Sequence, residues 1–243
     1  MYKAYLKKIH DLLYEVEETQ KNVILSASSM ITETLKKDGI LHVFGSGHSQ
    51  IFAMELFYRA GGLVPVNPIL TPEMALEPKA QLSTEAERQS GFAKVILSQE
   101  PVKAGNTIIV ASTSGRNAVP IEMAIEAKKL GLNVIAITSM KFSSQVESRH
   151  ESQKKLYECV DIVLDTCVDF GDAAMICDDL TVQFGPTSTV IGCAILQSVM
   201  AQVVENLVKL DIKPEIWVSS NTESGDEINK KYIEKYGSRV TCL

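Results

Sequence analysis

The chain has 243 residues, of which 45% are hydrophobic and 22% charged, as in a globular protein with a substantial core. Its net charge of -6 argues against nucleic acid as a partner, because phosphate backbones bind to basic faces. The 5 cysteines lack C-x-x-C spacing, which predicts free thiols rather than disulfides or a zinc site. The first residues form no apolar signal segment, and no later run is as long as a membrane span. We therefore expect a cytoplasmic protein without membrane contacts.

Residues 2–37 are predicted to form one long helix, ended by Gly39. Its apolar positions recur at steps of three and four: Leu6, Ile9, Leu13, Val16, Val23, Ala27 and Met30. We expect this N-terminal unit, residues 1–38, to pack on a single domain of residues 39–243 and on a partner subunit. The alternative is that the helix only covers one face of its own sheet.

Five short runs rich in β-branched residues follow the long helix. They are Ile40–Gly45, Leu63–Ile69, Thr107–Thr113, Asn133–Ser139 and Asp161–Thr166. Each is continuously apolar, as in strands covered on both faces, and helical patterns such as Asn117–Gly131 lie between them. This alternation predicts an α/β domain with a parallel sheet between two helical layers. Residues 70–91 have little apolar periodicity and predict a long connection, or two short helices, at the mouth of the sheet.

Three hydroxyl-rich turns lead into helices, two of them directly after strands. They are "GSGHS" (residues 45–49), "STSGRN" (residues 112–117) and "FGPTSTVIG" (residues 184–192). Ligands of parallel sheets bind at the carboxyl ends of the strands, where helix N-termini attract anions. The first turn is neither G-x-G-x-x-G nor a P-loop, so a nucleotide is disfavoured. Hydroxyls without a lysine suit a phosphate monoester on a polar small molecule, although serine and threonine also cap helices routinely.

The three turns together resemble the loops of the SIS (sugar isomerase) domain family, and the resemblance covers nearly the whole chain. "TSGR…P", residues 113–120, is similar to a loop of N-acetylmuramic acid 6-phosphate etherases, and "STSG" to one of phosphoheptose isomerases. The resemblance implies a three-layer α/β/α sandwich with a five-stranded parallel sheet and a dimer or higher homo-oligomer. It also implies a sugar phosphate as ligand and no cofactor. The implied phosphosugar-binding residues are Gly45, Ser46, Gly47, Ser49, Ser112, Thr113, Ser114, Thr187, Ser188 and Thr189.

Proton transfer between neighbouring carbons needs a carboxylate or imidazole near these loops. The candidates are His48, Glu55, Glu85 and Glu87. Glu85 and Glu87 are two residues apart and cannot share one helix face, so at most one of them is expected to reach the site. The better-known relatives are expected to carry a glutamate about ten residues beyond the loop serine, where this chain has Arg59. With only 4 histidines in the chain, we expect no metal.

Two classes of function fit these residues. The first is an aldose–ketose isomerase of sugar phosphates that uses carboxylate or histidine acid–base catalysis, with an etherase-type lyase acting on an amino-sugar phosphate as its variant. The second is a non-catalytic phosphosugar sensor, which would act through a protein partner because the chain shows no DNA-binding helix-turn-helix. A base within hydrogen-bond reach of the sugar favours the enzyme.

Overall fold

A computed structural model of the chain describes residues 1–243 and confirms the predicted parallel sheet. The strands are β1 (Leu41–Gly45), β2 (Val66–Ile69), β3 (Thr107–Ala111), β4 (Asn133–Thr138) and β5 (Ile162–Asp165). All neighbouring pairs are parallel, in the order β2-β1-β3-β4-β5. The order reverses beside β1, so the carboxyl ends of β1 and β3 frame the place where parallel sheets bind ligands.

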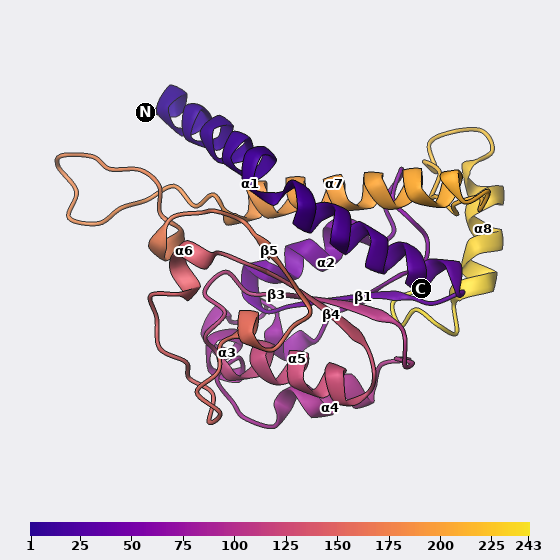
Figure 1. The fold of residues 1–243 in the computed structure, drawn as a ribbon, viewed down its shortest axis with the longest axis horizontal. Coiled ribbons are helices and arrows are strands. Elements are labelled where there is room, and N and C mark those ends of the chain that lie inside the picture. The colour runs from indigo at the N-terminus through magenta and orange to yellow at the C-terminus, as the bar shows by residue number, and fades with distance from the viewer.

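Helices cover both faces of the sheet (Figure 1). One layer contains α1 (Tyr2–Lys36), α2 (Gln50–Leu56) and α7 (Ser188–Lys209), and the other contains α4 (Phe92–Ser98) and α5 (Ala118–Lys129). The remaining helical elements are η1 (Gly47–Ser49), η2 (Pro72–Met74), α3 (Ala80–Ala86), α6 (Met140–Ser143), η3 (Leu156–Glu158), η4 (Phe170–Asp172) and α8 (Gly225–Tyr236). The chain is thus an α/β/α sandwich preceded by a long helix, as predicted.

Strand alternation divides the core into two apolar layers. In β3, Ile109 and Ala111 belong to the cluster beneath α1 and α7, whereas Ile108 and Val110 belong to the cluster beneath α4 and α5. All four side chains are fully buried, which explains why the strand is continuously apolar in sequence. The core therefore fixes both faces of the strand whose end carries the "STSGRN" turn.

The end of α1 differs in detail from the prediction. The residue with left-handed backbone is Asp38, at φ 56°, and not Gly39. Gly39 is required for a different reason, because a Cβ atom there would lie 2.7 Å from the carbonyl oxygen of Thr34. The glycine thus allows the chain to turn closely past the helix end and enter β1.

The expectation that no run reaches the length of a membrane span was wrong for α7. Its 22 residues are long and apolar enough to cross a membrane by composition alone. In the structure, however, α7 packs along α1 and α2 and contributes a buried stripe to the core beneath the sheet. Core helices of folded domains can be as long and as apolar as membrane spans, and α7 is a core helix of this kind.

Candidate functional site

A cleft of about 420 Å³ lies at the carboxyl ends of β1 and β3. It brings together the first two hydroxyl-rich turns, the end of α3 and the loop before η3. The lining residues are Ser46, Gly47, His48, Ser49, Leu76, Ser83, Thr84, Glu87, Ser112, Thr113, Ser114, Arg116, Asn117, Phe142, Arg149 and Asp172. Most of them are polar, and the volume is sufficient for a small ligand.

The first turn folds back tightly on the end of β1. Ser49 donates its N–H to the carbonyl of Ser46 at 2.9 Å, forming the single turn of η1. A Cβ atom at Gly45 would lie 2.3 Å from the carbonyl oxygen of Ser49, so only glycine leaves room for this turn. The turn presents His48 to solvent and Ser49 partly to the cleft.

The second turn is held open by contacts with the neighbouring strand. The carbonyl of Thr113 accepts from Thr138 Oγ1 and from Ser139 N, both at 3.1 Å. Gly115 has φ 57° and donates its N–H to Ser112 Oγ at 3.2 Å. A side chain at Gly115 would meet the Ser143 hydroxyl at 2.8 Å. The turn is therefore rigid, and its hydroxyls lie at the start of α5.

Backbone donors without a partner lie in both turns. The N–H groups of Gly47, His48, Thr113 and Ser114 donate to no other atom of the chain, although all four residues line the cleft. Backbone N–H groups are normally paired or hydrated. Free donors from two turns around one cleft, beside serine and threonine hydroxyls, form a site that favours an anion.

The third hydroxyl run has a different environment from the first two. Asp172, on the cleft wall, accepts hydrogen bonds from Thr187 N at 2.9 Å and from Ser188 N at 2.9 Å. Its other oxygen accepts from Ser188 Oγ at 2.6 Å. This carboxylate caps the N-terminus of α7, a position that attracts negative charge. Thr187 and Ser188 are buried against it, and neither they nor Thr189 line the cleft.

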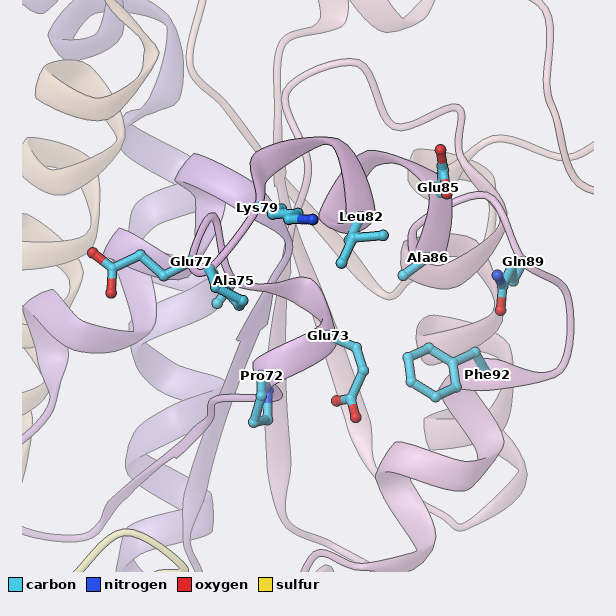
Figure 2. Close-up of a pocket in the computed structure, with 11 residues that line it drawn as sticks. Pro72, Glu73, Ala75, Glu77, Lys79, Leu82, Glu85, Ala86, Gln89 and Phe92 are labelled. Atoms are coloured by element: carbon cyan, nitrogen blue, oxygen red, sulfur yellow. The ribbon is translucent and has the colours of Figure 1, made fainter.

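The candidate acid–base residues separate into three environments. His48 and Glu87 line the cleft. Glu85 instead lines the rim of a second cavity of about 440 Å³ on the other side of α3, between η2 and α4 (Figure 2). Glu55 pairs with Arg59 and accepts from Gln197 Nε2 at 2.8 Å, beside α7 and away from the cleft. The structure therefore brings only His48 and Glu87 to the hydroxyl turns.

Two arginines that line the cleft were not predicted as site residues from the sequence. Arg116 donates from Nε to the carbonyl of Glu147 at 2.9 Å, and Arg149 donates from Nη1 to Asn117 Oδ1 at 2.8 Å. Burial, followed by the charges of Arg116 and Arg88, lowers the pKa of Arg149 from its usual range, while Glu87 acts in the opposite direction. Arg116 lies inside the "STSGRN" turn, whereas Arg149 comes from a loop distant in sequence that has no recognisable motif.

The other reactive groups offer little chemistry. No cluster of three or more histidine, cysteine or acidic side chains is arranged to hold a metal ion. Burial raises the pKa of the Cys167 and Cys193 thiols to about 11, so both are protonated near neutral pH.

Comparisons with known proteins identify the family of the chain. A model of the SIS domain family matches residues 4–139. The chain is 42% identical to a UPF0309 protein of Thermoanaerobacter pseudethanolicus, covering 98% of each. It is 40% identical to one of Geobacillus thermodenitrificans, covering 100% of this chain and 98% of the relative.

Solved structures show the same fold at low identity. A phosphoheptose isomerase from Francisella tularensis superposes with a TM-score of 0.55 at 16% identity, covering 84% of this chain and 96% of that one. The sugar isomerase domain of an RpiR transcription factor from Sphaerobacter thermophilus gives 0.52 at 12% identity, covering 98% of both. With its fold, its paired hydroxyl turns and the family match to more than half of its length, the chain belongs to the SIS domain family.

Proposed function

We propose that the chain binds a sugar phosphate in the cleft and interconverts its aldose and ketose forms. The observation that carries the proposal is that residues of two turns, with unpaired N–H groups and with hydroxyl side chains, line one cleft. The phosphate is held by Ser49 and by the turn of residues 112–114, at the start of α5, where the helix dipole favours negative charge. The sugar then extends toward α3.

Thr187, Ser188 and Thr189 have no direct place in this proposal. The Asp172 carboxylate already occupies the donors of Thr187 and Ser188 and repels a second anion from the same place. Their role here is to hold Asp172, and with it the wall of the cleft next to α7. The phosphate site is therefore built from the first two turns and not from all three.

Glu87 is proposed as the base. It is the one carboxylate of the lining besides Asp172, whose two oxygens both accept hydrogen bonds from α7. A carboxylate that takes the proton from the carbon beside the carbonyl gives an enediolate, and the same group, after its proton has exchanged with solvent, delivers a proton to the neighbouring carbon. One base thus suffices for isomerisation, and His48 lies in the cleft to move the hydroxyl proton.

A single free carboxylate favours isomerisation over the elimination of an ether. Elimination needs a base and also an acid that protonates the departing oxygen. Glu85 and Glu55 would be the natural partners for that step, but they lie outside the cleft. The lyase therefore has less support than the isomerase, with His48 as its one available acid.

The proposal is tested by binding and proton exchange together. A panel of sugar phosphates, with the matching free sugars, is first screened by thermal shift; a ligand at about a hundred times its Kd should add about 2.7 kcal/mol of stability. The ligand that stabilises the protein is then incubated with it in D₂O, and NMR should show deuterium entering at the carbon beside the carbonyl. Binding without exchange would replace the isomerase with the sensor, and binding of free sugars alone would remove both.

A homodimer is part of the same proposal, as is a cytoplasmic location. The first turns of α1 extend beyond the body of the molecule, and they leave Tyr2, Leu6 and Tyr14 exposed (Figure 1). A second copy would cover this apolar helix face. Light scattering should give twice the chain mass at micromolar concentration, and a monomer would contradict the dimer.

A further inference from the structure

Two guanidinium groups on the cleft wall have no carboxylate within ion-pair distance. The arginines that do form ion pairs, Arg59 with Glu55 and Arg239 with Asp38, lie elsewhere. Arg116 and Arg149 are instead fixed by one hydrogen bond each, to the Glu147 carbonyl and the Asn117 amide. Both residues line the cleft, and because each bond uses one N–H of the guanidinium, several donors on both groups remain without a partner in the chain.

The backbone fixes the two arginines next to one another. Arg149 N donates to the carbonyl of Arg116 at 2.7 Å, which joins the second turn to the loop before η3. Although the chain as a whole has a net charge of -6, this wall of the cleft is positive. The charges of Arg116 and Arg88 both lie close enough to Arg149 to lower its pKa. Glu87 is the nearby opposite charge, but it forms no ion pair with them. A pre-arranged positive cluster of this kind is stabilised when an anion binds.

Arg116 and Arg149 supply more hydrogen-bond donors and more positive charge than the binding of a single phosphate needs. Four free N–H groups and the hydroxyls of the two turns would be enough for the three terminal oxygens of one bound phosphate. Placing two further full charges on the same group would add little that these donors do not supply. The surplus points to a second negative group on the ligand.

We propose that the substrate of this cleft carries, besides its phosphate, a second anionic group, a carboxylate or a further phosphate, bound by Arg116 and Arg149. The inference rests on the proposed phosphosugar function and narrows its substrate class. Carboxylate and phosphate each present a pair of oxygen atoms whose spacing two N–H groups of a guanidinium match. A neutral sugar end would leave both arginines to water.

A matched pair of ligands tests the second anion. Sorbitol 6-phosphate and gluconate 6-phosphate share their phosphate and four stereocentres, and differ only at C1, a CH₂OH group against a carboxylate. Wild type should bind gluconate 6-phosphate about tenfold more tightly by calorimetry, which corresponds to partly exposed charge-assisted pairing. Arg116→Gln combined with Arg149→Gln should reduce this ratio to about one and leave the Kd of sorbitol 6-phosphate within about twofold.

Arg88→Gln is the matched control, because it removes a nearby charge that does not line the cleft. The Arg88→Gln variant should keep most of the preference for gluconate 6-phosphate over sorbitol 6-phosphate. The melting temperature of each variant without ligand verifies that it is folded. Equal binding of the two ligands to wild type would overturn the inference and leave the phosphosugar function standing. So would equal weakening of both ligands in the double variant, since the arginines would then hold the phosphate or the loops. Binding of neither ligand, with no sugar phosphate active in the wider panel, would contradict the proposed function itself.

Discussion

Glu87→Gln should lower the rate of solvent deuterium exchange into the bound sugar phosphate by about 10²–10⁴-fold. Glutamine keeps the size and polarity of the side chain in the cleft but cannot accept the proton from carbon. Because the phosphate contacts come from the two turns, the Kd should change much less than the exchange rate. Exchange followed by NMR and binding followed by calorimetry separate the two effects.

The same substitution two residues earlier provides the control. Glu85 is exposed and lines the rim of the other cavity, so Glu85→Gln should exchange deuterium at the wild-type rate. Full activity in Glu87→Gln would show that the base lies elsewhere, with His48 as the next group of the cleft to replace. A loss of binding in parallel with exchange would instead make Glu87 a ligand contact.

Acid should destabilise the protein through one buried histidine. His42 in β1 is fully buried, with Nε2 3.2 Å from Asn106 Oδ1 and Nδ1 3.1 Å from Asn67 Nδ2. Asn67 also binds Glu100 and receives the N–H of Thr241, which ties the C-terminal segment to the sheet. Burial lowers the pKa of His42 to about 4, because the neutral ring fits this network and the apolar surroundings disfavour its charge.

The direction of the pH effect on stability follows from the pKa of His42 in the unfolded and in the folded chain. Above pH about 6.5, the usual pKa of histidine, the ring is neutral in both states and the full stability is present. Between pH about 6.5 and 4 the unfolded chain takes up a proton and the folded one does not, so the free energy of unfolding falls by about 3 kcal/mol. Below the folded pKa both states are protonated and this loss ends.

Denaturant titrations at several pH values in this range measure the slope of the free energy of unfolding against pH. His42→Gln should lose the slope caused by His42, whatever its stability at neutral pH, because the titrating ring is gone. His10→Gln, at an exposed position of α1, should keep the wild-type slope. Equal slopes in wild type and His42→Gln would show that other groups cause the acid sensitivity.

The fold could be predicted from the sequence because its determinants are local. Runs such as Asn133–Ser139 are apolar on both faces, which is typical of central parallel strands, and β4 spans Asn133–Thr138. Gly131, expected to end the preceding helix, has φ 80°. The end of α1 could not be predicted in the same way. The crowding at Gly39 comes from Thr34 and Asn106, and the spacing of apolar residues in the sequence does not reveal these contacts.

The site was predictable only in part, because its walls come from distant segments. The two turns were found since each follows a strand and opens a helix. Arg149 was missed because long-range hydrogen bonds bring it to the cleft, from its side chain to Asn117, 32 residues away, and from its N–H to the carbonyl of Arg116. The capping of α7 by Asp172 likewise joins segments 15 and 16 residues apart. The separation of Glu85 from Glu87, in contrast, follows from helical spacing, and the two lie beside different cavities.

The central claim, that the turn of residues 112–114 holds a phosphate, is tested most directly by titrating wild type and Ser114→Ala with one sugar phosphate and its free sugar. Wild type should bind the phosphorylated form alone, and loss of a hydroxyl bond to a charged oxygen should weaken it about tenfold or more. Ser98→Ala, an exposed serine of α4, should bind as wild type does. Equal affinity in wild type and Ser114→Ala, or equal binding of the free sugar, would contradict the account.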